Sequence, residues 1–323
     1  MENLIDIRDL RKRFGSLVAV DGVSLAIQRG EVLGFLGPNG AGKSTTMKMI
    51  TGFMAPTGGS VSVCGHDVAS APLAAKKCIG YLPEGAPAYG EMTPASFLSF
   101  IADIRGLKGQ HKAARIREVV EKINLGGVLQ QSIETLSKGF KRRVGLAQAI
   151  LHDPEVLILD EPTDGLDPNQ KHEVRALIKE MAAHKAIIIS THILEEVDAV
   201  CTRAAIIARG RLLFLGTPAE LEAKSAWHNA VSLSVASEQA ETIAAMLSTV
   251  SGVARVERKP VSAGQQKMTV LARDGARVFE PVQALVRQHG WQVDELYVES
   301  GHLDEVFRNI TTTAGALGEV AHS

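Results

Sequence analysis

The sequence predicts an α/β fold with a parallel central sheet and an all-helical insertion, followed by a smaller α+β domain. Two short runs, VLILD (156–160) and AIIIS (186–190), are almost wholly apolar, as are central strands that helices cover on both faces. Strand-like and helix-like stretches alternate ahead of them, as in βαβ units. Beyond residue 230 the order changes to strand, helix, strand, strand, helix, strand.

The N-terminal part supplies the elements of the first domain. Its early strand-like segments are LIDIRDL (4–10), VSLAI (23–27), EVLGFLG (31–37), GSVSVCG (59–65) and CIGYLP (78–83). A helix is expected from Lys43, and another, at about 169–184, separates the two core strands. Apolar residues with helical spacing at 94–105, 112–123 and 138–152 place the helical insertion at about 88–153.

The C-terminal part differs in composition from about residue 216. Its expected strands are 231–236, 252–258, 267–273 and 291–299, and its expected helices are 238–249 and 276–289. This βαββαβ order is that of ferredoxin-like folds. An amphipathic helix, LDEVFRNIT (303–311), follows. The predicted organisation is a first domain at 1–220, a linker at 221–230, a ferredoxin-like domain at 231–311 and a flexible tail at 312–323.

Composition excludes several classes of protein. The 323 residues carry a formal net charge of −1 and the isoelectric point is near 6.8, which argues against nucleic acid or an anionic membrane surface as the main partner. Cys64, Cys78 and Cys201 form no CxxC pair, so neither a disulfide framework nor a zinc site is expected, and a reducing cytosolic compartment fits. The N-terminus lacks the apolar core of a signal peptide, and the longest apolar runs fall far short of the roughly 20 residues that span a bilayer. We expect a soluble protein.

A glycine-rich segment between a strand and a helix carries the strongest motif. GPNGAGKST (37–45) matches the P-loop motif G-x-x-x-x-G-K-[ST], whose glycines let backbone N–H groups surround phosphates. Lys43 is expected to reach the β- and γ-phosphates, and Ser44 to ligate Mg²⁺. The predicted nucleotide-binding residues are Gly37, Pro38, Asn39, Gly40, Ala41, Gly42, Lys43, Ser44 and Thr45. The alternative is a glycine-rich turn that opens a helix.

The ends of the two core strands carry the other candidate catalytic residues. Asp160 ends VLILD and is expected to ligate Mg²⁺, as does the strand-end Asp of other proteins with this motif. Glu161 points to the other side of the strand, where a carboxylate can orient or deprotonate an attacking water. His192, at the end of IIISTH, is expected to contact the γ-phosphate, because open α/β sheets bind ligands at this edge. The alternatives are a solvated strand end and a structural histidine.

A helix start in the segment ETLSKGFKRRVGLAQAI (134–150) is unusually basic. Ser137 has the properties of an N-cap, yet Lys138, Lys141, Arg142 and Arg143 follow it, where the helix dipole disfavours cations. Cations there are expected if an anion binds at the helix N-terminus. A head-to-tail pair, in which this helix caps the γ-phosphate on the partner's P-loop, is one explanation; a basic surface helix is the other.

Taken in order, GPNGAGKST, LSKGF…RVGLAQAI, VLILDEPTDGLDP and STH resemble the ATPase subunit of ATP-binding cassette (ABC) transporters, over about residues 1–220. The segments YLPE, LSKG, LDPNQ and LDEVFRNIT are similar to cassettes of the ABC-2 and gliding-motility type. The resemblance implies a P-loop NTPase fold and ATP hydrolysis with Mg²⁺. It also implies a dimer with two ATP molecules at its interface, whose closure drives a separate membrane subunit.

The resemblance assigns further residues. It implies that the signature motif is Leu136 to Phe140, with Ser137, Lys138 and Gly139 at the other subunit's γ-phosphate. It implies that Phe14 stacks on adenine, that Gly165, Leu166 and Asp167 form the D-loop, and that His192 is the switch histidine.

Three residues depart from the family pattern. Lys138 stands where the signature usually has Gly, which adds charge at the anion site. Glu84 stands where the family has a Gln that senses Mg²⁺, and a carboxylate can still ligate that ion. Asp164 begins the D-loop where a small polar residue is more usual.

The expected partners are a second ATPase subunit, in a homodimer, and a separate polytopic permease of an exporter; nucleic acid is not expected. Together they place the chain at the cytoplasmic face of the inner membrane. The alternatives are a cassette ATPase that acts on ribosomes or nucleic acid, and a regulatory cassette without turnover. The segment from Glu84 to about Arg105 is a candidate groove for the permease. Its apolar residues, which could equally be local core, are Tyr89, Met92, Phe97, Leu98 and Phe100. Ferredoxin-like modules bind effectors, pair with copies of themselves or merely pack, and for the C-terminal domain we expect dimerisation or regulation.

Overall fold

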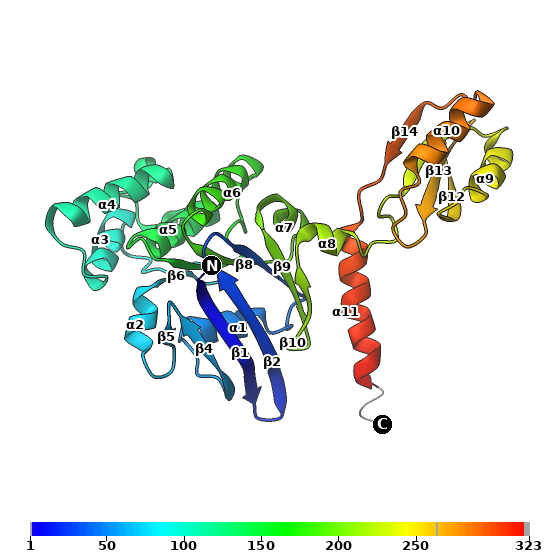
Figure 1. Ribbon diagram of the computed structural model, residues 1–323. Helices are drawn as coiled ribbons and strands as arrows, with labels where there is room; N and C mark the ends of the chain where they lie inside the picture. The colour runs from blue at the N-terminus through cyan, green and yellow to red at the C-terminus, as the bar shows by residue number, and fades with distance from the viewer. Residues whose placement is uncertain (1, 263, 320–323) are drawn as a thin grey trace. The chain divides into compact units, whose positions relative to one another are not determined.

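The computed structural model describes residues 2–262 and 264–319 of the chain. These residues divide into two compact units, Met1–Gly216 and Thr217–Ser323 (Figure 1). Each unit is built around its own sheet, as the sequence predicts.

A six-stranded sheet forms the centre of the first unit, in the order β10-β9-β3-β8-β7-β6. Its strands are β3 (Val32–Leu36), β6 (Ile79–Leu82), β7 (Val156–Asp160), β8 (Ala186–Thr191), β9 (Arg203–Ala208) and β10 (Arg211–Gly216). Strands β6, β7, β8, β3 and β9 pair in parallel, and β10 pairs with β9 antiparallel. The carboxyl ends of the parallel strands therefore meet at one edge, and the P-loop, Glu84, Glu161 and His192 all follow strands that end there.

Alternate residues of the central strands enter two different cores. Leu157 and Ile187 pack with the helices on one face, whereas Ile158 and Ile188 pack with α1 and the antiparallel sheet on the other. All of them are fully buried. The wholly apolar runs arise because both faces of this sheet are covered.

The second sheet of this unit is antiparallel and has the order β2-β1-β4-β5. Its strands are β1 (Asn3–Phe14), β2 (Leu17–Gln28), β4 (Gly58–Val63) and β5 (His66–Asp67). Helices α1 (Lys43–Ile50) and α2 (Pro72–Lys77) contribute residues to the buried cluster that contains apolar residues of both sheets.

Helices cover the other face of the central sheet. The helical insertion contains α3 (Pro94–Ile104), α4 (Gly109–Lys122), two 3₁₀ turns, η1 (Gly126–Val128) and η2 (Ile133–Thr135), and α5 (Lys138–Ile150). Helices α6 (Pro168–Ala182) and α7 (Leu194–Val200) follow β7 and β8. Apolar residues of α3 to α6 form one buried cluster with the sheet.

The second unit begins with α8 (Pro218–Glu222) and contains a four-stranded antiparallel sheet of order β12-β13-β11-β14. Its elements in chain order are β11 (Val231–Ala236), α9 (Ala240–Ser248), β12 (Val253–Ser262), β13 (Gln265–Ala272), α10 (Phe279–His289), β14 (Glu295–Val298) and α11 (Leu303–Glu319). The βαββαβ order and the central position of β11 and β13 agree with the predicted ferredoxin-like fold.

Several expected boundaries were wrong. The residues from 312 onward, expected to be a flexible tail, continue α11 to Glu319, and residues 320–323 lie outside the described part. The expected linker at 221–230 includes the end of α8, which a capping box at Thr217 stabilises. Strands β9 and β10 and helices α2 and α7 were not expected at all.

Candidate nucleotide-binding site

The P-loop wraps the start of α1 at the carboxyl end of β3. Gly42 has φ 105°, and a Cβ there would lie 2.5 Å from the carbonyl oxygen of Ala19, so only glycine fits. Pro38, Asn39 and Gly40 are exposed at the tip of the loop. The glycine-rich segment thus leaves its backbone accessible to a ligand, as the sequence predicts.

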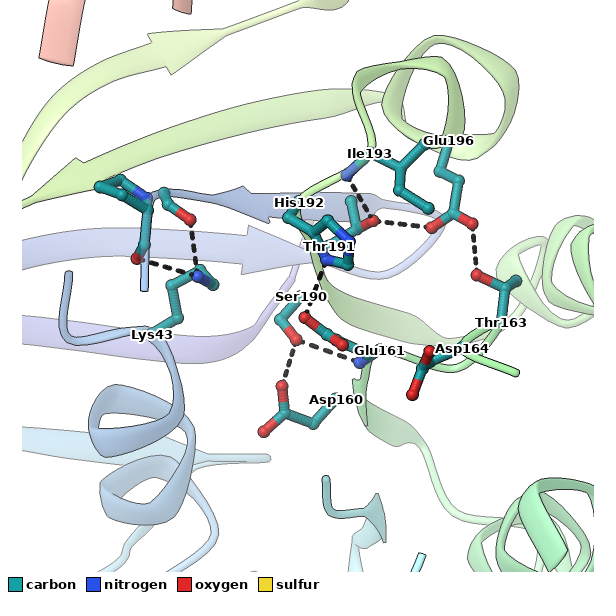
Figure 2. Close-up of polar contacts among 12 residues, drawn as sticks. Lys43, Asp160, Glu161, Thr163, Asp164, Ser190, Thr191, His192, Ile193 and Glu196 are labelled. Atoms are coloured by element: carbon teal, nitrogen blue, oxygen red, sulfur yellow. Dashed lines mark hydrogen bonds and ion pairs between the residues drawn. The ribbon is translucent and has the colours of Figure 1, made fainter. Parts of the chain in front are cut away.

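Lys43 is buried and its ammonium group turns onto the loop. Its Nζ donates hydrogen bonds to the carbonyl oxygens of Gly37 (2.6 Å) and Pro38 (3.2 Å), as Figure 2 shows. Burial lowers the pKa of Lys43, while the charges of Glu161 and Asp160 act in the opposite direction. The ammonium is therefore held at the P-loop by neutral carbonyl oxygens, which negatively charged phosphate oxygens can replace.

Asp160 is almost completely buried at the end of β7. Ser190 donates a hydrogen bond to its Oδ1, whereas Oδ2 has no hydrogen-bond partner among the described residues. A buried carboxylate oxygen without a protein partner is suited to ligate a cation. Ser44, Glu84 and Asp160 line one cavity of about 550 Å³, so the three predicted metal ligands come together. Their donor atoms are all oxygens, which suits Mg²⁺.

Glu161 follows Asp160 with an unusual backbone conformation, φ 50°. Its N–H donates to the backbone carbonyl and to Oγ of Ser190, both at 3.1 Å. Its Oε1 lies 3.0 Å from Nδ1 of His192, at the end of β8 (Figure 2). The predicted hydrolytic carboxylate and the predicted switch histidine are thus direct neighbours.

A buried glutamate, which the sequence analysis missed, supports this pair. Glu196 on α7 accepts hydrogen bonds from Thr163 Oγ1 and, at 2.7 Å, from Thr191 Oγ1. The same Thr191 oxygen accepts from the N–H of Ile193 at 3.0 Å (Figure 2). Arg175 lies 3.7 Å from Glu196. The glutamate therefore ties the loop after β7 to the backbone on both sides of His192. Its only sequence signal is an acidic residue within an otherwise apolar helix face.

The basic start of α5 is built differently from the prediction. Ser137 is the N-cap, since its Oγ accepts from the N–H of Phe140 at 3.3 Å. We expected four cations at the start of α5 to help bind an anion. This is wrong for Arg142 and Arg143, whose side chains are buried. Arg143 lies 3.0 Å from Glu173.

Two further cations of α5 also have partners within the chain. Lys141 donates to the carbonyl oxygen of Glu134 at 2.8 Å, and Lys138 lies 2.8 Å from Asp164. A charge pattern alone does not tell which cations a helix buries.

Phe14 ends β1 with its side chain partly exposed, and the ammonium of Lys12 lies 5.2 Å from its ring centroid. Ala19, on the following strand, passes directly over Gly42. The hairpin that bears Phe14 therefore lies beside the P-loop, as an adenine-stacking role requires.

The candidate groove is partly core. Phe97 and Leu98 are buried in the helical cluster, so for these two the alternative of local core holds. Tyr89 is 60% exposed and Phe100 39% exposed, and with Met92 they line a concave site of about 640 Å³.

Cys64 and Cys78 come together although the sequence separates them. Their sulfurs and a carboxylate oxygen of Glu155 lie within 4.8 Å of one another. Burial, and then the neighbouring Cys78, raise the pKa of Cys64 to about 12, and Arg29 pairs with Glu155. Because metals bind thiolates, we assign no metal here.

A P-loop at the edge of a parallel sheet, with a buried aspartate that has one unpartnered oxygen and a Glu–His pair beside it, defines a P-loop nucleotide-binding protein. A sequence model of the family "ABC transporter" matches residues 20–164. In the part of the chain that the structure describes, no helix is long and apolar enough to cross a membrane.

Two relatives and a solved structure extend this similarity. The linearmycin resistance ATP-binding protein LnrL of Bacillus subtilis (strain 168) is 30% identical over 309 residues, which cover 95% of this chain and 98% of LnrL. The protein named probable multidrug ABC transporter ATP-binding protein YbhF of Escherichia coli (strain K12) is 37% identical over 226 residues, but these cover only 39% of its length. A solved ATP-binding subunit of an ABC transporter is 32% identical, with a TM-score of 0.64, and the match covers 68% of this chain and 92% of that one. The chain belongs to the ABC transporter family, as an ATP-binding subunit.

Proposed function

We propose that the chain hydrolyses ATP as a head-to-tail homodimer and thereby powers a separate polytopic permease of an exporter. The single observation that carries the proposal is the hydrolytic set at one sheet edge: Glu161 lies 3.0 Å from His192, next to the buried and half-satisfied Asp160. A nucleotide-binding module without turnover does not need this set. The names of LnrL and YbhF, a linearmycin resistance protein and a multidrug transporter subunit, support export.

The residues of the chain divide the chemistry among them. The P-loop N–H groups and Lys43, released from the carbonyls of Gly37 and Pro38, bind the β- and γ-phosphates. Ser44, Asp160 and Glu84 would hold Mg²⁺, which neutralises charge on the phosphate oxygens when bound. Phe14 stacks on the adenine.

Glu161 orients the attacking water and accepts its proton, while His192 positions the γ-phosphate. Ser137 and Gly139 of the second copy, at the N-terminus of α5, complete the site, because a helix N-terminus stabilises negative charge. The D-loop, Gly165 to Asp167, is expected to lie at the same dimer interface.

The concave site with Tyr89 and Phe100 is the surface on which we place the permease. Exposed aromatic side chains in a hollow commonly mark protein interfaces. Docking there puts this chain on the cytoplasmic face of the inner membrane.

The first test is MgATP turnover by the purified chain. Lys43→Ala is expected to lose roughly 10²–10³-fold in kcat, the scale of one preorganised transition-state contact. Glu161→Gln is expected to bind ATP, hydrolyse it poorly and accumulate as a dimer in light scattering. A monomeric Glu161→Gln chain in saturating MgATP contradicts the head-to-tail arrangement.

The second test is a pull-down of the tagged chain from gently solubilised membranes. A polytopic membrane protein at near-stoichiometric yield is expected, and Tyr89→Glu is expected to abolish its recovery. Val261→Glu, which changes a similarly exposed residue of the second unit, is the matched control. Recovery of ribosomal proteins instead would overturn the transporter assignment.

A further inference from the structure

Two residues that depart from the family pattern, Lys138 and Asp164, are partners of each other. Nζ of Lys138 lies 2.8 Å from Oδ2 of Asp164. The same carboxylate oxygen lies 3.6 Å from the guanidinium of Arg142, one turn further along α5. Asp164 is therefore held between two cations of the helix that carries the signature motif.

The contact with Arg142 makes this more than a surface ion pair. The side chain of Arg142 is only 4% exposed, and it also donates to the carbonyl oxygens of Pro83 (3.3 Å) and Asp160 (3.4 Å). A buried guanidinium needs a counter-charge, and Asp164 supplies one. The hydrogen bond from Lys138, and further the charges of Lys138, Arg142 and His192, lower the pKa of Asp164 although burial opposes them, so the carboxylate stays charged.

The stem of Lys138 fits closely over the D-loop. Gly165 has φ 74°, and a Cβ there would lie 2.7 Å from Cδ of Lys138. The lysine thus crosses the D-loop backbone before its ammonium reaches Asp164. Any larger residue at 165 would push the lysine off.

The other end of this connection reaches the hydrolytic residue. The N–H of Asp164 donates to the carbonyl oxygen of Glu161 at 3.1 Å, which closes the turn after β7. A displacement of Asp164 is therefore passed to the backbone of Glu161 through a single hydrogen-bonded turn.

We propose that Asp164 is a positioning residue, clamped by Lys138 and Arg142, that makes the start of α5 and the carboxylate of Glu161 move as one body. The inference rests on the proposed head-to-tail dimer. In that dimer the start of α5 serves the partner's nucleotide, whereas Glu161 serves the nucleotide of its own P-loop. The clamp then couples the two ATP sites, and Lys138 acts through Asp164 rather than as a phosphate ligand.

The test is a double-mutant cycle on the full chain with Lys138→Met, which keeps the apolar stem, and Asp164→Asn, which keeps the shape. Asp164→Asn is expected to lower kcat about tenfold, as misplacement of a catalytic group does, with half-saturating MgATP within about twofold of wild type. Lys138→Met is expected to have a smaller effect of the same kind. The double variant is expected to be no worse than Asp164→Asn alone. Asp164→Glu and Lys138→Arg are expected to restore most of the turnover.

Asp103→Asn is the matched control, because it breaks the Lys112–Asp103 pair (2.7 Å) of the same helical insertion, and it is expected to leave kcat unchanged. A double variant with the product of the two single losses overturns the clamp. A Lys138→Met variant whose half-saturating MgATP concentration rises, while that of Asp164→Asn does not, also overturns the clamp, since Lys138 would then be a phosphate ligand. Wild-type kcat in Asp164→Asn also overturns the clamp while the proposed function survives. A wild-type chain without MgATP turnover overturns the proposed function itself.

Discussion

Glu161, the proposed hydrolytic carboxylate, has a backbone conformation that L-residues seldom adopt. Its φ of 50° lies in the left-handed region, where a side chain costs on the order of 1 kcal/mol or more. Ser190 holds its N–H with two acceptors, and the turn to Asp164 holds its carbonyl. These bonds impose the conformation that directs the carboxylate to His192.

The strain at Glu161 can be separated from its chemistry with two variants. Glu161→Gly and Glu161→Ala both remove the carboxylate, so both are expected to lose turnover alike. Glycine adopts this φ without penalty, and the glycine variant is expected to be about 1 kcal/mol more stable than the alanine variant. Urea unfolding of the two chains measures the difference. Equal stabilities would show that the backbone relaxes once the carboxylate is gone.

His152 is expected to make the free energy of unfolding depend on pH. Burial lowers the pKa of His152 to about 4, with the charge of Arg105 contributing and the bond to the Ile79 carbonyl opposing. Between pH 6.5 and pH 4 the unfolded chain therefore binds a proton that the folded chain excludes. The free energy of unfolding is expected to fall by about 3 kcal/mol over this range as the pH decreases.

The contribution of His152 to the pH dependence of stability is tested by replacing its side chain. His152→Gln can still donate to Ile79 and is expected to flatten the pH dependence of denaturant unfolding between pH 6.5 and 4. His184→Asn, at an exposed position, serves as the control and is expected to change nothing. A slope unaltered by His152→Gln would assign the acid sensitivity to other groups.

At the scale of elements, α7 is positioned by one buried carboxylate. Glu196 joins this helix to Thr191 at the end of β8 and to Thr163 after β7, and both hydroxyls donate to it. Arg175 of α6 adds a charge on the same oxygen as Thr163. Three elements around the Glu161–His192 pair thus share a single anchor.

We expect Glu196→Gln to lower kcat by about tenfold with little change in half-saturating MgATP, because the pair loses its alignment while the P-loop is untouched. Its neighbour Glu195 is exposed on the same helix, so Glu195→Gln is a control for charge and is expected to retain wild-type turnover. Steady-state kinetics of the two variants decides the matter. A higher half-saturating MgATP concentration in Glu196→Gln would instead show that Glu196 supports nucleotide binding.

The sequence predicted some elements and their neighbours correctly and missed others. The P-loop, Asp160, Glu161 and His192 were identified correctly as neighbours, because parallel strands bring their carboxyl ends to one edge. Strand β9 was missed although it pairs with the next strand, β10, because its place in the central sheet depends on β3, about 170 residues earlier in the chain, at Leu33↔Arg203. Glu196 was missed for a similar reason: its burial depends on hydroxyls from two other elements. Local patterns cannot reveal such long-range partners.

At the scale of the whole molecule, the chain contains two separately cored units. The residues of the central sheet and its helices form buried clusters distinct from the one that β11 to β13 form with α9 and α10. The proposed nucleotide-binding residues all belong to the first unit, Met1–Gly216. A ligand of the P-loop is therefore expected to stabilise one core and not the other.

Calorimetry of the full chain is expected to resolve two unfolding transitions, of which MgADP raises only one. At a ligand concentration 100 times Kd, the first unit gains about 2.7 kcal/mol, which corresponds to a shift of roughly 5–10 °C for a domain of this size. Lys43→Ala supplies the control, because the transition of the first unit should then shift much less while the other stays in place. The assignment of each transition follows from the same scan of a chain that ends at Gly216. A single transition that MgADP raises as a whole would mean that the two cores unfold cooperatively, and the second unit would then report on nucleotide occupancy.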